Sequence, residues 1–158
     1  MAYSIRPYQD SDAEALASVC RAAIKGIGPE AYSDEQVDVW LSRHPGAELY
    51  RERVSNGATI FVAADEDDAP VAYALLEPDG HLDHLYNDPA HIRKGLALNL
   101  LTTASLYAKH HGITRLYTEA SDLARPSFEE AGHVATEKRE FEIDGVPIHN
   151  WAMEKAID

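Results

Sequence analysis

One segment, residues 88–110, limits the fold more than any other part of the chain. It starts as DPAHIRKGLALNLL, a proline loop with Arg93, Lys94 and the lone Gly95 that leads into an uninterrupted helical pattern. Apolar residues occupy nearly every side of this helix instead of one stripe. Because a helix that is apolar all round must be buried, residues 93–110 are expected to pack against a sheet.

Strand patterns flank this helix on both sides. Three apolar segments with turn signals between them predict an antiparallel meander over residues 59–64, 71–77 and 81–86. A further strand is expected at residues 114–120, after the helix. A strand-helix-strand connection of this kind makes the strands before and after the helix a parallel pair within an otherwise antiparallel sheet.

The remaining segments complete a mixed α/β pattern. Ser33 and Gln36 form a capping-box pattern that begins a helix, and the sequence RHPG at 43–46 ends it. The other expected elements are a strand at 3–8, helices at 10–28 and 125–132, and a final hairpin turned by IDGV. The predicted order is β-α-α-β-β-β-α-β-α-β-β, in a single domain over residues 1–158 because no repeat or linker divides the chain.

The charge of the chain restricts its partners. Asp and Glu number 27 against 14 Lys and Arg, which gives a net charge of −13. A field of this sign repels nucleic acid and anionic lipid and attracts cations. We therefore expect no nucleic-acid or membrane partner, and an amine substrate suits this surface. A homodimer is among the assemblies that such a composition allows.

Three features of the sequence predict a cytoplasmic protein. The longest apolar run, at 58–64, is too short to cross a bilayer. The N-terminal sequence has no basic region followed by an apolar segment and a cleavage site. Cys20 is the single cysteine, which excludes an internal disulfide framework and fits a reducing compartment.

The start of the helix at 93–110 is suited to an anion. A loop that enters a helix leaves several N–H groups unpaired, and a glycine lets a ligand approach the backbone, so phosphate is the natural guest. The Walker loop needs glycine directly before lysine, whereas Lys94 precedes Gly95 here. The dinucleotide fingerprint needs three spaced glycines, and this loop has one.

The sequence LYNDPAHIRKGLALNLL resembles the acetyl-CoA-binding signature of the GNAT N-acetyltransferase superfamily. Gly95 and Ala97 match the last two positions of that signature, while Ile92 stands where the family usually has Arg or Gln. The segment EASDLARPSFEEAGHV is similar to the family's downstream motif, and the ending IDGVPIHNWAMEKA resembles a small prokaryotic branch of the superfamily.

The resemblance implies a GNAT-like fold, with a mostly antiparallel central sheet and one parallel, splayed strand pair. It implies an acetyl-CoA-dependent N-acetyltransferase in which a primary amine of a small molecule or peptide attacks acetyl-CoA, the co-substrate, directly in a ternary complex. The residues expected to bind the cofactor are Leu85, Tyr86, Asn87, Arg93, Lys94, Gly95, Leu96, Ala97, Leu98 and Ser121.

A catalytic base is expected on the strand at 81–86. Its sequence HLDH brings His81, Asp83 and His84 near the cleft, and a free histidine titrates near pH ~6.5. Alternation puts His84 on the opposite face from the other two, but a bulge of the kind found in the family breaks this parity. We predict Asp83 and His84 as catalytic residues, with ordinary polar strand positions as the alternative.

No metal site is predicted from these histidines. Adding His110 or His111 to the HLDH residues gives no pair with a recognised zinc spacing.

Two positions depart from the family pattern. Phe128 stands where a tyrosine often protonates the leaving thiolate, and it has no proton to donate. Either the thiolate leaves unaided, since a thiol ionises near pH ~8.5, or Tyr86 or Tyr117 takes this role. Ser121 replaces an asparagine that contacts CoA in the family. These departures keep a second hypothesis open, a non-catalytic CoA-binding regulatory module.

The acceptor pocket is expected between the first two helices and the final hairpin. Its aromatic candidates are Tyr32, Trp40, His149 and Trp151, for each of which core packing is the alternative role.

Overall fold

The computed structural model describes residues 2–44 and 46–158, and its strands form two sheets. The four-stranded antiparallel sheet has the order β1 (Ser4–Pro7), β2 (Thr59–Ala64), β3 (Pro70–Leu76), β4 (Leu82–Asn87). The three-stranded sheet has the order β5 (Arg115–Ala120), β7 (Val146–Ala156), β6 (Val134–Ile143). The predicted mixed α/β class with antiparallel pairing is confirmed.

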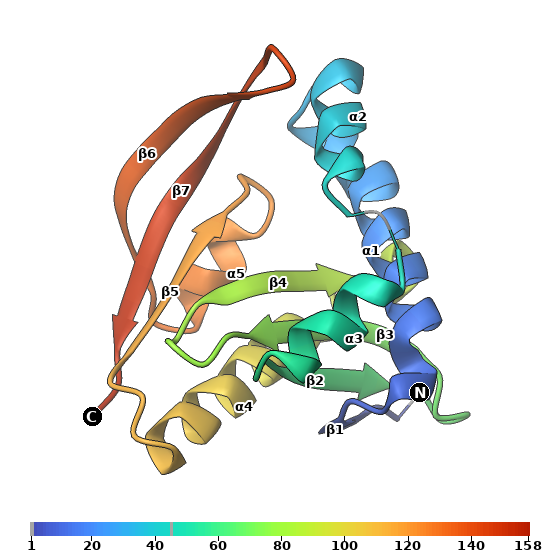
Figure 1. The fold of residues 1–158 in the computed structure, drawn as a ribbon, viewed down its shortest axis with the longest axis vertical. Coiled ribbons are helices and arrows are strands. Elements are labelled where there is room, and N and C mark those ends of the chain that lie inside the picture. The colour runs from blue at the N-terminus through green and yellow to red at the C-terminus, as the bar shows by residue number, and fades with distance from the viewer. Residues whose placement is uncertain (1, 45) are drawn as a thin grey trace.

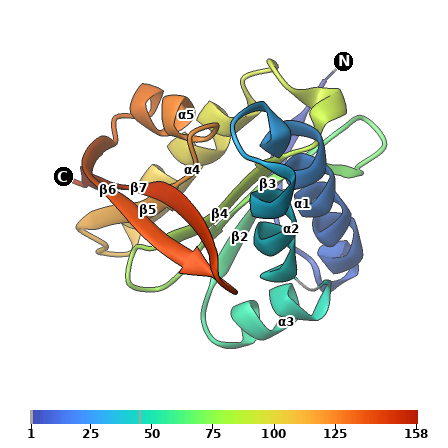
Figure 2. The ribbon, with the colours of Figure 1, turned by 90° about the horizontal axis from the view of Figure 1, so that it is seen from above.

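Five α-helices in the described chain cover these sheets (Figure 1, Figure 2). They are α1 (Ala13–Ile27), α2 (Asp34–Ser42), α3 (Glu48–Ser55), α4 (Leu96–His110) and α5 (Arg125–Glu130). The first three lie on one face of the four-stranded sheet, and α4 lies on the other (Figure 2). The two inner strands β2 and β3 are therefore buried on both faces, which explains their nearly continuous apolar sequences.

The helix α4 forms the core of its face, as its sequence predicts. Leu96, Leu100, Leu101 and Ala104 are at most 2% exposed and belong to the same apolar cluster as Leu116 of β5. Burying each leucine contributes roughly 1.5–3 kcal/mol to the free energy of folding. The helix thus fixes β5 beside the four-stranded sheet.

Two helix predictions need correction. The sequence ELYRERVS of α3 was not predicted as a helix because Tyr50 is its single fully buried residue, a weaker signal than an apolar stripe. In α4 the first helical residue is Leu96 and not residue 93, because Arg93 (φ 61°) and Gly95 (φ 75°) are left-handed. The capping box of Ser33 and Gln36 is confirmed, whereas Pro45 of the predicted stop signal lies outside the described residues.

The strands β4 and β5 are parallel neighbours at one end and diverge from there. A single parallel bridge pairs His81 with Tyr117, whose N–H donates to the Gly80 carbonyl at 3.0 Å. The Thr118 hydroxyl then donates to the Leu82 carbonyl at 2.7 Å. β5 pairs with β7 along its whole length, and beyond Thr118 it has no pairing with β4 among the described residues. The predicted parallel pair is therefore present only where it begins.

A bulge interrupts β4 at Asp83. Leu75 of β3 pairs with His84, and the next residue, Leu76, pairs with Leu82, so Asp83 has no residue opposite it. The bulge gives Asp83 a direction that strict alternation along the strand would not give it.

The far end of β4 leaves two amides for a ligand. Asp88 donates to the Val71 carbonyl at 2.8 Å, and hydrogen-bonded and non-bonded pairs alternate along antiparallel strands. The Tyr86 amide therefore points to β3, and the amides of Leu85 and Asn87 point to the side from which β5 has diverged.

In the described chain, no helix is long and apolar enough to cross a membrane.

Gly80 is predicted to be essential for the junction of β4 and β5. A Cβ atom there would lie 2.1 Å from the Arg115 carbonyl oxygen, and its φ of +101° disfavours side chains. We expect Gly80→Ala to lower the free energy of unfolding by about 3 kcal/mol in urea denaturation, since backbone has to move. Gly112→Ala is the control, with φ +71° but open space around its Cβ, and should cost about 1 kcal/mol. Equal losses would contradict the close approach.

Candidate functional site

The loop between β4 and α4 presents a row of amides without protein acceptors. None of the six N–H groups from Arg93 to Leu98 donates a hydrogen bond to a described residue, and Asn99 is the first that does, to Gly95 at 3.1 Å. A left-handed residue followed by a right-handed one, as at Gly95 and Leu96, turns successive amides to one side. Apart from its chain neighbours, no described residue lies within 4 Å of a Cβ built on Gly95, so the space in front of these amides is open. The amides from Arg93 to Leu98 are called the anion cradle below.

A cavity of about 410 Å³ lies beside this loop. All the residues predicted to bind the cofactor line it, except Lys94: they are Leu85, Tyr86, Asn87, Arg93, Gly95, Leu96, Ala97, Leu98 and Ser121. Ile92, which replaces a polar residue of the family signature, adds an apolar contact to the same wall. The structure thus gathers the predicted residues in one place, and their roles toward a ligand stay predictions.

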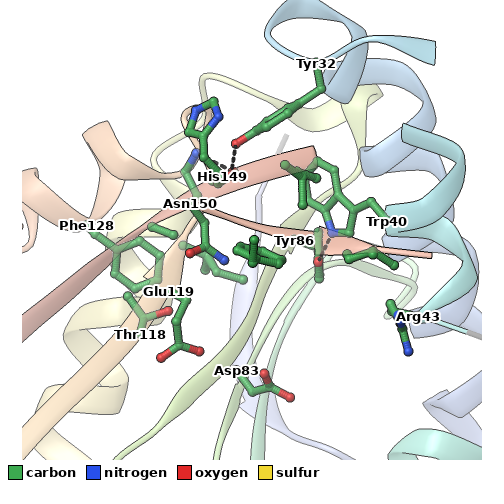
Figure 3. Close-up of a pocket in the computed structure, with 17 residues that line it drawn as sticks. Tyr32, Trp40, Arg43, Asp83, Tyr86, Thr118, Glu119, Phe128, His149 and Asn150 are labelled. Carbon is green, nitrogen blue, oxygen red and sulfur yellow. Dashed lines mark hydrogen bonds between the residues drawn. The ribbon is translucent and has the colours of Figure 1, made fainter. Parts of the chain in front are cut away.

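A second cavity of about 220 Å³ lies between α2, the ends of β4 and β5, and the β6–β7 hairpin (Figure 3). Tyr32, Trp40 and His149 line it, as predicted for the acceptor pocket. Trp151 does not line it, because its indole N–H donates to Asp122 at 2.7 Å and its ring lies 4.2 Å under the Arg125 guanidinium.

Tyr32 fixes the hairpin against the rest of this cavity. Its hydroxyl donates to the His149 carbonyl at 3.2 Å and accepts the Asp122 N–H at 3.0 Å (Figure 3). Its ring meets Trp40 edge-on, with 5.6 Å between ring centroids. One buried tyrosine therefore joins the first helices, the β5–α5 loop and β7.

The two cavities share part of their walls. The residues that line both are Trp40, Leu85, Tyr86, Ser121 and Ala124. These residues surround the point where β4 and β5 diverge, so a ligand in one cavity can contact a ligand in the other.

The Tyr86 hydroxyl is already engaged by protein groups. The His44 Nδ1–H donates to the Trp40 carbonyl at 3.2 Å, which leaves the His44 Nε2 lone pair to accept from Tyr86 at 3.2 Å. The Trp40 indole N–H donates to the same hydroxyl at 3.2 Å, and burial raises the pKa of Tyr86 well above its usual range. The Tyr86 proton thus points to His44 and not into a cavity.

The other tyrosine considered for the leaving group lies elsewhere. The Tyr117 hydroxyl donates to Asp79, and neither residue lines either cavity. Phe128 does line the acceptor cavity, where its ring is 2% exposed. The described site therefore offers no free tyrosine hydroxyl at the junction of the cavities.

Two carboxylates from the diverging strands form one end of the acceptor cavity (Figure 3). Asp83 comes from the bulge of β4 and accepts from the Arg53 guanidinium at 2.5 Å. Glu119 comes from β5 and accepts from His81 Nε2 at 2.8 Å. Burial alone would raise the pKa of Asp83, but its interactions with His84, Arg53 and His81 together more than offset this effect, so the pKa lies below its ordinary value.

His81 ties the acidic groups together. Its Nδ1 lies 2.7 Å from Glu77 and its Nε2 lies 2.8 Å from Glu119. Burial of the ring opposes its charge, but hydrogen bonds to Glu119 and Glu77 prevail and raise the pKa of His81 to about 9. At neutral pH it is an imidazolium whose two N–H groups both donate to carboxylates.

His84, predicted as a catalytic residue, lines neither cavity. It is 3% exposed, and its Nδ1 lies 2.9 Å from the Tyr73 hydroxyl on the face covered by α1. Burial lowers the pKa of His84 to about 3, so it is neutral. The bulge turns Asp83 to the acceptor cavity, and His84 lies behind it, with Nε2 3.7 Å from the Asp83 carboxylate. Because His84 lines neither cavity, a ligand would contact Asp83 and not His84.

Glu119 is the site residue that the sequence analysis missed. The segment at 114–120 predicts a strand correctly, but nothing in it tells which side chains face the divergence from β4. In the structure, its neighbours Thr118 and Ala120 are buried, and Glu119 points the other way.

Comparison with known proteins shows which family the chain belongs to. The sequence pattern of the acetyltransferase (GNAT) domain matches residues 29–155. The chain belongs to the GNAT acetyltransferase family. No curated protein sequence matches this GNAT protein.

Three solved structures show the same fold. A GCN5-related N-acetyltransferase from Rhodopseudomonas palustris is 28% identical, with TM-score 0.88 over 99% of this chain and 96% of that one. The PaiA N-acetyltransferase of Thermoplasma acidophilum, in complex with coenzyme A, is 20% identical, with TM-score 0.79 over 99% of each chain. YncA of Salmonella typhimurium, with acetyl-CoA, is 19% identical, with TM-score 0.72 over 100% of this chain and 95% of that one.

The charge of His81 should be visible in a titration. We expect its imidazole signals in nuclear magnetic resonance spectra to titrate with a midpoint near pH 9. Because this pKa is raised above ~6.5, the stability that His81 contributes is full below pH ~6.5 and is lost as the pH rises through 9. The difference in free energy of unfolding between wild type and His81→Asn should shrink over that interval. A midpoint near 6.5 would contradict the ion-pair geometry.

Proposed function

We propose that this acetyltransferase uses acetyl-CoA and transfers the acetyl group to a primary amine in a ternary complex. The meeting of the two cavities, where β4 and β5 diverge, is the observation that carries this proposal. One cavity is bordered by an anion cradle and the other ends at two carboxylates. The similar structures from T. acidophilum and S. typhimurium contain coenzyme A and acetyl-CoA, which supports the same ligand here.

The residues of the larger cavity fit acetyl-CoA. Amides from Arg93 to Leu98 would hold its diphosphate, with the positive end of the α4 dipole behind them. The Asn87 side-chain oxygen is buried and accepts no hydrogen bond from a described residue, so it suits an amide N–H of the pantetheine arm. The free amides of Leu85 and Asn87 are donors for its carbonyl oxygens.

The acceptor amine reaches the junction from the smaller cavity. Acetyl-CoA supplies a thioester, whose carbonyl carbon forms a bond with the amine nitrogen while the bond to sulfur breaks. We assign the proton-accepting role to Glu119, directly or through a water molecule, because its second carboxylate oxygen is not engaged by His81. Asp83, with its lowered pKa, is a weaker base and is better suited to hold the ammonium before transfer.

The leaving group departs as a thiolate in this proposal. Phe128 has no proton to donate, and the Tyr86 proton is directed to His44. A thiol ionises near pH ~8.5, so the thiolate is a tolerable product without a general acid. The same two observations favour the second candidate, a CoA-binding module without turnover.

Acetyl-CoA binding has a direct test in Gly95→Glu. We expect acetyl-CoA at ~100 times its Kd to stabilise wild type by ~2.7 kcal/mol in a thermal-shift assay. Gly95→Glu should remove this stabilisation, because a carboxylate would stand in the anion cradle. Gly145→Glu at the tip of the β6–β7 hairpin is the matched control, with φ +80° and equally open surroundings. A shift retained in Gly95→Glu would place acetyl-CoA elsewhere.

A turnover assay distinguishes an N-acetyltransferase from a CoA-binding module without catalysis. We expect thiol release from acetyl-CoA when pooled primary amines are added, and a drop of about 100-fold in kcat for Glu119→Gln. The acetyl-CoA thermal shift of this variant should match wild type, because Glu119 lines only the acceptor cavity. Stabilisation by acetyl-CoA without thiol release from any amine would favour the module.

A further inference from the structure

The acceptor cavity combines apolar walls with a charged end. Phe141 and Ile143 of β6, Ile148 of β7, and Trp40 of α2 provide most of its sides. These walls lie between the hairpin and α2, and the carboxylates lie at the opposite end, where β4 and β5 separate (Figure 3). A bound molecule thus meets apolar surface along its length and charge at one end.

The charged end carries one uncompensated negative charge. Glu77, Asp83 and Glu119 are three carboxylates against two cations, Arg53 and His81, so one negative charge remains at neutral pH. All five side chains are partly buried, so this surplus is screened less than surface charge. A single ammonium would neutralise it.

The other charged groups near the cavity lie beside the hairpin and not between β4 and β5. Arg139 of β6 donates to the Asn150 side-chain oxygen at 2.9 Å and does not itself line the cavity. At the rim, Arg43 lies 3.8 Å from Asp144 of the hairpin turn, so this pair adds no net charge. On the β7 side, Asp122 accepts from both Trp151 and His149 and does not line the cavity.

We infer that the acceptor is a monocationic primary amine with an apolar, ring-sized body and no carboxylate. This inference rests on the proposed N-acetyltransferase function and names its substrate class. The ammonium would lie between Asp83 and Glu119, and the body would contact Phe141 and Ile143. A cavity of about 220 Å³ has room for a group of this size and is too small for a peptide of several residues.

Two related classes fit less well for physical reasons. An amino acid would bring its carboxylate close to the Asp83 and Glu119 carboxylates, since its ammonium and carboxylate share one carbon. A short diamine would leave its second ammonium between apolar walls, where desolvation of an unpaired charge is costly.

The test compares acceptors that differ in charge or in the ring, in thiol-release assays with acetyl-CoA. We expect kcat/KM for 2-phenylethylamine to exceed that for phenylalanine and for putrescine by about tenfold or more, which is ~1.4 kcal/mol for the added carboxylate or the added ammonium. Propylamine, which keeps the charge and lacks the ring, should also be weaker. A preference for phenylalanine or putrescine would overturn the inference and leave N-acetyl transfer standing.

Two variants test the charged end and the apolar wall of the cavity independently. Asp83→Asn should raise KM for 2-phenylethylamine about tenfold and leave the acetyl-CoA thermal shift unchanged. Glu140→Gln is the control, because it removes an exposed carboxylate next to Phe141 that does not line the cavity. Phe141→Ala, which keeps every charge, should instead reduce the preference for 2-phenylethylamine over propylamine. An unchanged KM in Asp83→Asn, or an unchanged preference in Phe141→Ala, would contradict the assignment.

Binding tests the inference even without turnover. Calorimetric titration of 2-phenylethylamine, phenylalanine and putrescine into the CoA-loaded protein should give the same order of affinity as the kinetic comparison. If no amine releases thiol and 2-phenylethylamine still binds most tightly, the proposed catalysis fails and the ligand class stands. If 2-phenylethylamine binds no better than putrescine, the ligand class fails.

Discussion

The separation of β4 from β5 is the constraint on which the rest of the structure depends. The strands approach closely at Gly80 and Arg115, where a Cβ has no room, and they are then drawn apart because β5 completes a different sheet with β7. An open sheet would normally satisfy its inner amides by pairing neighbouring strands. Here the separation leaves the Leu85 and Asn87 amides without strand partners and creates the junction of both cavities between the two sheets.

The chain is strongly acidic, yet the proposed acetyl-CoA site has to bind an anion, and backbone amides can do this. A protein with net charge −13 repels a diphosphate at long range, and in the proposed site the amides of the loop before α4 would supply the attraction locally. Backbone dipoles cannot be neutralised by the surrounding carboxylates as side-chain cations can. The same acidity is useful at the other cavity, where Asp83 and Glu119 are held by Arg53 and His81 and still leave room for one more cation.

Local sequence patterns predicted the local structure well, but they did not predict how segments distant in the sequence lie relative to one another. The all-round apolar helix, the capping box at Ser33 and the glycine of the loop before α4 each depend on neighbouring residues, so the sequence carries their signal. The residues around the larger cavity were predicted because that loop and the end of β4 are contiguous in the chain.

The acceptor cavity was predicted less completely, because its residues come from distant segments. The position of the β4 bulge depends on pairing with β3, so the sequence could not tell which of His81, Asp83 and His84 face the cavity. Glu119 became visible only when β5 was placed next to β4. The helix α3 is held by the hydrogen bond of Tyr50 to Tyr73 on another element, not by an apolar stripe of its own.

The attachment of the β6–β7 hairpin has an evolutionary consequence. The hairpin extends from the three-stranded sheet and meets α2 through a few contacts, such as the Gln36 amide on the Pro147 carbonyl at 2.9 Å (Figure 1). It contributes Phe141, Ile143 and Ile148 to the acceptor cavity and nothing to the wall of the larger one. Mutations in this arm can therefore change what is acetylated while the donor site stays intact, which lets descendants of one ancestral gene diversify in substrate without losing their common chemistry.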